Sequence, residues 1–178
     1  MEQTITTFYL EMRNPDELKF KDCAESAFWI GECREKQFEY NRFLYKLIGA
    51  DWQWFDKRPW TDNDWREYSE NSNLRTWVGY MVGSIAGYYE LQRQDNDNIE
   101  IAYFGLAKPF IGRGLGGHLI SHAIKSAWEW GANRVWVHTC TLDHPNALTN
   151  YTARGMKIYK EEIANNRLVA DAGSNALL

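Results

Sequence analysis

The sequence predicts an α/β domain whose sheet is mostly antiparallel. Three strand-like segments, 75–82, 84–92 and 99–106, follow one another and are joined by short polar connections that are typical of hairpins. A glycine-rich turn then opens a long amphipathic helix over residues 114–130. The short apolar segment 135–138 follows that helix, so we expect it to lie parallel to the strand before the helix.

The N-terminal third adds two strands and two helices to this prediction. Residues 4–12 partly alternate between polar and apolar side chains, and 27–33 is a second short strand candidate. A helix is predicted over 39–48, with four apolar side chains on one face and Gly49 as its stop. The segment 51–59 is irregular. Thr61 is a suitable N-cap for a second helix because acidic residues fill the first turn.

The C-terminal part continues the alternation of helix and strand. Pro145 suits the first turn of a helix that ends near Arg154, and Gly155 closes it. Residues 156–163 are predicted as a final long strand. Beyond Asn165 the pattern is weak, and we expect a short edge strand at 167–170 within a loose tail over 166–178.

Size and composition indicate a single globular domain over residues 1–178. The chain has 44% hydrophobic and 25% charged residues, which are ordinary values for a soluble protein. No apolar run approaches the roughly 20 residues that span a bilayer. The N-terminus has neither a basic start nor an apolar signal core, and the three cysteines show no metal-type pairing. A cytoplasmic protein with no membrane partner is the simplest expectation.

The most informative segment is 106–117, in which an apolar strand runs through several glycines into a helix. Glycines let the backbone approach a ligand closely, and a helix N-terminus carries about half a positive charge. Such a turn suits a phosphate or diphosphate. Gly112, Gly114 and Gly117 also satisfy the dinucleotide fingerprint G-x-G-x-x-G, but antiparallel strands precede the turn and no acidic residue ends the next strand. We therefore disfavour a dehydrogenase.

Two spaced motifs resemble the GNAT superfamily of N-acetyltransferases. The family's acyl-CoA motif Q/R-x-x-G-x-G/A is similar to residues 111–116, with Ile111 replacing the usual Gln or Arg. The later signature N-x-x-A-x-x-x-Y-x-x-x-G is similar to residues 144–155, where Ala147, Tyr151 and Gly155 keep their spacing and His144 stands for the Asn. The resemblance covers residues 76–163 well. It implies the GNAT fold, a centrally splayed mixed sheet flanked by helices, here with an extra N-terminal strand.

The resemblance also implies acetyl-CoA as cosubstrate and supplies candidate site residues. Glu100 lies on the strand before the glycine turn, where relatives carry a glutamate base, and alternation predicts that it shares a face with Ala102, Phe104 and Leu106. Tyr103 and Glu90 are reserve bases. Tyr151 matches the tyrosine that protonates the leaving sulfur. The expected cofactor-binding residues are Leu106, Ala107, Ile111, Gly112, Arg113, Gly114, Leu115, Gly116, Gly117, His144 and Asn146.

The acceptor side is less specific. The Trp-rich segment 51–65 falls where the family keeps a mobile part of its acceptor site, and we expect Trp54 and Trp60 to line a pocket there or to hold a cation. Cys140 with His138 or His144 is a remote alternative nucleophile. His118 and His122 are spaced like zinc ligands on a helix, but nothing else supports a metal, and none is expected.

The sequence thus predicts an acetyl-CoA-dependent N-acetyltransferase that transfers the acetyl group directly to a primary amine of a small molecule or peptide. A catalytically silent acyl-CoA-binding module is the alternative. The net charge of −4 disfavours nucleic acid. The acceptor and the oligomeric state, including a homodimer, stay open.

Overall fold

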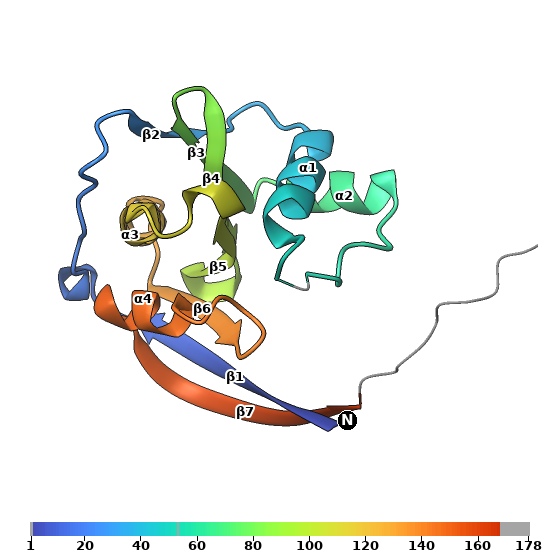
Figure 1. Ribbon diagram of the computed structural model, residues 1–178, viewed down its shortest axis with the longest axis vertical. Coiled ribbons are helices and arrows are strands. Elements are labelled where there is room, and N and C mark those ends of the chain that lie inside the picture. Colours follow the sequence, from blue (N-terminus) through green and yellow to red (C-terminus); the bar gives the residue numbers. More distant parts are fainter. Residues whose placement is uncertain (1, 53, 168–178) are drawn as a thin grey trace, which may run out of the picture.

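The sheet contains seven strands in the order β2-β3-β4-β5-β6-β1-β7. In the computed structural model, which describes residues 2–52 and 54–167, α3 and α4 lie on one side of the sheet and α1 and α2 on the other (Figure 1). All neighbouring strands are antiparallel except β5 and β6. The predicted α/β class and the single parallel pair are confirmed.

The elements follow the predicted order closely. Their bounds are β1 Glu2–Met12, β2 Phe28–Glu32, α1 Phe38–Gly49, α2 Asp62–Ser69, β3 Leu74–Met81, β4 Ser84–Arg93, β5 Asn98–Leu106, α3 Leu115–Glu129, β6 Arg134–Cys140, α4 Ala147–Ala153 and β7 Lys157–Arg167. The Thr61 hydroxyl accepts from the Asp64 amide while the Asp64 carboxylate accepts from the Thr61 amide, so the predicted cap of α2 is a full capping box.

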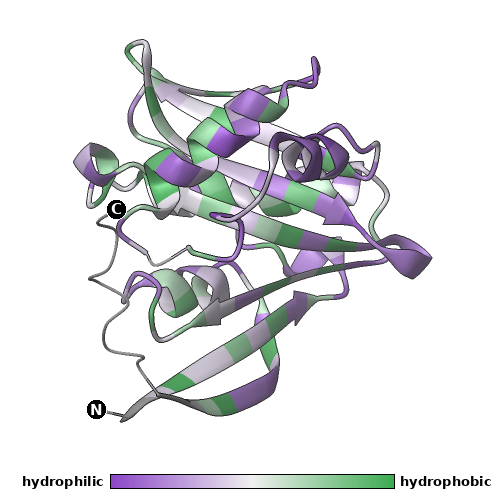
Figure 2. Ribbon diagram, turned by 90° about the vertical axis from the view of Figure 1, so that its right-hand side faces the viewer, coloured by the Kyte–Doolittle hydropathy of each residue, from purple (hydrophilic) through white to green (hydrophobic). Residues whose placement is uncertain are grey.

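Each face of the sheet has its own core. Leu119, Ile120 and Ala123 of α3 are fully buried against strand residues such as Tyr89 and Leu91. On the opposite face, Leu44 and Ile48 of α1 pack against Val78 and Tyr88. The hydropathy colours change repeatedly along the strands, as expected for strands whose side chains point alternately to the two faces (Figure 2). No helix within residues 2–52 and 54–167 is long and apolar enough to cross a membrane.

The strands β5 and β6 separate after a short parallel contact. They pair only from Asn98 opposite Arg134 to Glu100 opposite Trp136, so residues 101–106 of β5 have no ladder partner on that side. The polypeptide chain of β6 instead continues along β1, from Met12 opposite Val135 to Thr7 opposite Cys140. This is the central splay that the sequence resemblance implied.

The C-terminal strand is longer than predicted. β7 continues through Asn165 and Asn166 to Arg167 because β1 pairs with it along its whole length, from Glu11 to Glu2. The sequence expectation of a break after Ile163 was therefore wrong: the extra N-terminal strand supplies backbone partners that compensate for weak strand propensity. The rest of the expected edge strand and tail lies outside the described residues.

A β-bulge in β5 overturns one predicted face. Glu90 of β4 lies opposite Tyr103 and Leu91 opposite Ile101, which leaves Ala102 as an extra residue. The bulge reverses the alternation, so Phe104 and Leu106 pack on the α3 side together with Ile101. Simple alternation predicted that Glu100 shares a face with Phe104 and Leu106. This prediction was wrong, because the bulge places Glu100 on the opposite face. It shares the α1 face with Tyr103 and Glu90.

Candidate active site

The glycine turn places uncapped backbone amides at the start of α3. Gly112 and Gly114 both adopt positive φ angles, +83° and +79°, which favour glycine over any residue with a side chain. Gly114 is the N-cap, and no side chain caps the helix there. A Cβ built on either residue would meet nothing within 4 Å, so the turn is open on its outer side. The first helical N–H groups lack intrahelical partners and can hold an anion.

The neighbouring predicted residues lie around this turn. Leu115 is fully buried and anchors the helix, whereas Arg113 is exposed and forms an ion pair with Glu25 at 3.4 Å. The backbone N–H of Ile111, the residue that replaces the usual Gln or Arg, donates to the Lys108 carbonyl and closes a short 3₁₀ turn. Gly117 is tightly packed, because a Cβ there would come within 3 Å of Lys21 and Arg154.

At the end of β5, the backbone N–H and C=O of Leu106 point to the side on which β6 no longer pairs with β5. Ala107 donates its N–H to Ala86 O at 2.9 Å, which makes this a hydrogen-bonded antiparallel pair. In such ladders bonded and non-bonded pairs alternate, so the Leu106 N–H and C=O point away from β4. Of the two predicted contacts, Leu106 is therefore available to a ligand, while the N–H of Ala107 is engaged.

Tyr151 of α4 lies on the α3 side of the sheet. It is 5% exposed, and its ring meets that of Phe104 edge-on with centroids 6.0 Å apart. Within the described part of the chain its hydroxyl has no hydrogen-bond partner. Burial raises the pKa of Tyr151, so the phenol stays protonated. A buried, protonated and unengaged hydroxyl is suited to donate to a ligand atom.

Glu100 forms a pair with His138, which the sequence analysis considered only as a partner of Cys140. His138 Nδ1 lies 3.3 Å from one Glu100 oxygen, and Gln94 Nε2 donates to the other at 2.8 Å. The hydrogen bond with Glu100 raises the pKa of His138. These residues come from β5, the following strand β6 and the β4–β5 connection. A parallel neighbour brings His138 beside Glu100 two residues after the ladder ends.

A second carboxylate, Glu90 on β4, is more deeply buried than Glu100. It is 1% exposed and accepts hydrogen bonds from Asn41 of α1 at 2.8 Å and from Tyr68 of α2 at 2.6 Å. Burial raises the pKa of Glu90, and these two donors oppose the rise. The sequence signal for this group was an acidic residue inside an otherwise apolar strand. Its partners come from distant helices and have no local signal.

The Trp-rich segment supplies a buried cation. Lys57 Nζ lies 3.9 Å from the ring centroid of Trp60, 4.3 Å from that of Tyr68 and 5.1 Å from that of Tyr103. Trp54 instead packs against Tyr45, Tyr88 and Tyr103. Of the two predicted acceptor-side tryptophans, Trp60 therefore contacts a cation and Trp54 joins the aromatic packing. Lys57 sits among polar neighbours in an irregular segment, and nothing in the sequence marked it.

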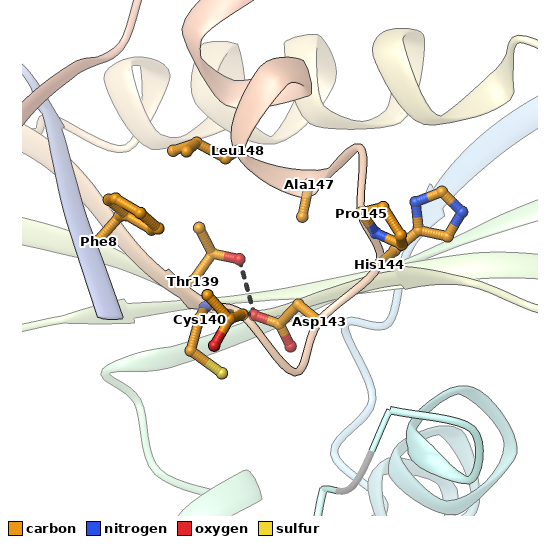
Figure 3. Close-up of a pocket in the computed structure, with 9 residues that line it drawn as sticks. Phe8, Thr139, Cys140, Asp143, His144, Pro145, Ala147 and Leu148 are labelled. Atoms are coloured by element: carbon orange, nitrogen blue, oxygen red, sulfur yellow. Dashed lines mark hydrogen bonds between the residues drawn. The ribbon is translucent and has the colours of Figure 1, made fainter. Parts of the chain in front are cut away.

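The loop between β6 and α4 lies beside the Trp-rich segment. The ring of His144 meets that of Trp52 edge-on at 5.2 Å, which joins the Trp-rich segment to the β6–α4 loop. Asn146 is the N-cap of α4, and its N–H bonds His144 Nδ1 at 3.1 Å. A small pocket of about 260 Å³ lies under this loop, with Phe8 and Leu148 on one side and Cys140 and Asp143 below (Figure 3).

The alternative chemistries receive little support from their surroundings. Burial raises the pKa of Cys140, which disfavours a thiolate, and His138 is paired with Glu100 instead. His122 Nδ1 is 2.7 Å from the Tyr89 hydroxyl, and His118 Nδ1 is 3.0 Å from Lys21 O. Among residues 2–52 and 54–167, no three His, Cys, Asp or Glu side chains are grouped to hold a metal ion.

Solved structures share this fold over nearly the whole chain. A GCN5-related N-acetyltransferase from Sphaerobacter thermophilus superposes with a TM-score of 0.70 at 13% identity, over 91% of this chain and 51% of that one. Another from Kribbella flavida gives 0.66 at 16% identity, over 89% and 56%. An aminoglycoside acetyltransferase from a soil metagenomic sample gives 0.61 at 17% identity, over 73% and 88%. The chain thus spans about half the length of the first two. A search of curated proteins gave no match.

The fold and the glycine-led helix define a domain built on a splayed sheet with an uncapped helix N-terminus at the end of β5. The family model described as the acetyltransferase (GNAT) family matches residues 41–156, well over half of the sequence. The chain belongs to the GNAT acetyltransferase family.

Proposed function

We propose that this protein transfers the acetyl group of acetyl-CoA to a primary amine of a small molecule or peptide, directly and without an acyl-enzyme. The observation that carries the proposal is the uncapped N-terminus of α3, led by Gly114 in a left-handed conformation. It lies near Leu106, at the end of the part of β5 that β6 leaves unpaired. The amides there would hold the diphosphate of the cosubstrate. The outward-facing Leu106 N–H and C=O would bond the amides of the pantetheine arm.

The chemistry requires a base, because an alkylammonium with a pKa of about 10.4 cannot attack a thioester until it loses a proton. Glu100 is the proposed base, and its partner His138 lies within hydrogen-bond reach to pass a proton onward. Attack on the carbonyl forms an oxyanion, which a free backbone N–H beside the splay would stabilise. Tyr151 would protonate the thiolate of CoA as the C–S bond breaks. Acidic and aromatic groups on the α1 face favour a cationic amine as acceptor.

The cosubstrate site is tested by Gly114→Glu. A carboxylate in the turn would repel the diphosphate, and we expect CoA binding, measured by calorimetry, to be abolished. Gly83→Glu is the matched control: Gly83 also has a positive φ, +82°, and open space around it, but it lies in the β3–β4 hairpin. It carries the same backbone strain without touching the site. Equal CoA affinity in Gly114→Glu and the wild type would refute the diphosphate site.

Tyr151→Phe separates an enzyme from a silent acyl-CoA-binding module. The change removes one hydroxyl from a buried ring that has no hydrogen-bond partner in the described residues, so the fold and CoA affinity should persist. We expect acetyl transfer to a panel of amines, followed by release of free thiol, to fall by about 10²-fold. A protein that binds CoA but releases no thiol above background with any amine, in either form, would be the silent module.

A further inference from the structure

Lys57 is a buried cation enclosed by aromatic rings from three different parts of the fold. Its side chain is 10% exposed. Trp60 belongs to the α1–α2 segment, Tyr68 to α2 and Tyr103 to β5, and all three ring centroids lie within 5.1 Å of Nζ. Such an arrangement attracts an ammonium group through the negative faces of the rings. The protein therefore contains a built ammonium site, which its own side chain fills.

Three carboxylates act on the charge of this ammonium group. Asp56 Oδ2 lies 3.5 Å from Nζ, and Glu90 and Glu100 are near enough to act on its charge. Tyr68 connects the site to Glu90, because its hydroxyl donates to the Glu90 carboxylate while its ring faces Nζ. Burial lowers the pKa of Lys57, and the neighbouring carboxylates oppose this shift.

The ammonium site lies on the acceptor side of the splay. Tyr103 directly follows the bulged Ala102, at the level where β5 no longer pairs with β6. Glu100, the proposed base, lies on the same face of β5. Tyr151, the proposed acid, lies on the opposite face of the sheet, with Phe104. Lys57 is therefore a buried primary amine whose charge the proposed base Glu100 influences.

We propose that Lys57 Nζ is an internal acetyl acceptor, which the protein acetylates on itself; this rests on the proposed acetyl-CoA-dependent function. The ammonium passes one proton to a neighbouring carboxylate, and the neutral nitrogen attacks the thioester carbonyl. A C–N bond forms and the C–S bond breaks. The sulfur leaves as the thiol of CoA with a proton from Tyr151. The nitrogen releases its second proton to solvent, and solvent reprotonates Tyr151. The product is a neutral amide, which removes the cation from the aromatic cage.

The test is to incubate the full chain with acetyl-CoA and to locate acetyl groups by intact mass and by peptide mapping over time. Lys46, an exposed lysine of α1, is the matched site for uncatalysed acetylation. We expect Lys57 to be modified at least about tenfold faster than Lys46, because a held amine reacts as if highly concentrated. The rate should not depend on protein concentration. K57R keeps the cation and should lose the fast phase, whereas K46R should retain it.

The outcomes separate this inference from the function on which it rests. If the protein binds CoA and acetylates free amines but leaves Lys57 unmodified, self-acetylation is wrong and the proposed function stands. If Lys57 is modified no faster than Lys46, or equally fast in Gly114→Glu, the modification is uncatalysed and the inference fails. If CoA does not bind the wild type, the proposed function fails and the inference fails with it.

Discussion

Glu100 and His138 form a carboxylate–imidazole pair between neighbouring strands. The Glu100 carboxylate is 9% exposed, and the hydrogen bond to it raises the pKa of His138. Burial by itself would lower that pKa. Glu100 is the largest cause of the rise, and Asp143 and Asp56 add to it, so removing the charge of Glu100 isolates its share.

Glu100→Gln should lower the pKa of His138, measured by the titration of its ring signals in NMR spectra. The amide keeps the size of the side chain but cannot stabilise an imidazolium, so burial then dominates. His122 is the internal control: burial lowers its pKa, and its hydroxyl partners Tyr89 and Ser126 lie on the opposite face of the sheet. An unchanged His138 titration would contradict the pair.

The same variant reports on the proposed base. If Glu100 removes the proton of the acceptor amine, Glu100→Gln should reduce turnover by about 10²-fold near neutral pH. The loss should shrink at high pH, where more of the amine is already neutral. A uniform loss across the pH range would instead assign Glu100 a positioning role.

At the scale of elements, the sequence predicted the secondary structure well because periodicity and caps are local signals. The helix at the glycine turn and the three antiparallel strands followed from apolar spacing and from turn residues near Gly83. The bulge at Ala102 did not, because it depends on the register between β4 and β5 rather than on any residue that demands it. One inserted residue moved Phe104 and Leu106 to the face opposite Glu100.

The candidate site also contains residues that local sequence signals located and residues that they did not. The glycines of the turn and Tyr151 carry fixed spacings within one motif, so the sequence located them. Lys57 could not be predicted, because its environment is assembled from the α1–α2 segment, α2 and β5. The sequence also could not show which aromatic residues of this segment pack and which face a cation, because Trp54 and Trp60 lie in an irregular stretch with no periodic pattern.

On the scale of the whole molecule, Glu90 joins both helices of one face to the centre of the sheet. Asn41 of α1 and Tyr68 of α2 donate to its two oxygens, and Asn41 also donates to Thr76 of β3. The cationic groups Lys57 and Lys36 also act on this carboxylate. Burying an acid costs free energy when it ionises, so the folded state holds the Glu90 proton more tightly than the unfolded state does.

Glu90→Gln should therefore change the pH dependence of stability in a defined direction. A raised pKa contributes stability that is complete below the ordinary value of 4.5 and is lost as the pH rises through the raised value. The amide introduced by this substitution cannot titrate, so the free energy of unfolding of the variant does not fall as Glu90 ionises. Because the amide carries two N–H groups where the protonated acid carries one O–H, one N–H is left without an acceptor in this buried site, and we expect the variant to be less stable than the wild type by about 1–3 kcal/mol at low pH. The difference in the free energy of unfolding between the wild type and the variant, measured by urea unfolding, should narrow as the pH rises.

Glu32→Gln provides a control of opposite sign. Arg75 donates to the Glu32 carboxylate at 2.7 Å, and this hydrogen bond lowers the pKa of Glu32. A lowered pKa contributes stability that is present at neutral pH and is lost as the pH falls through the lowered value. The gap between wild type and Glu32→Gln should therefore narrow toward acid, while that of Glu90→Gln narrows toward neutral pH. Parallel curves for the two variants would show that Glu90 is not the buried acid that links the α1–α2 layer to the sheet.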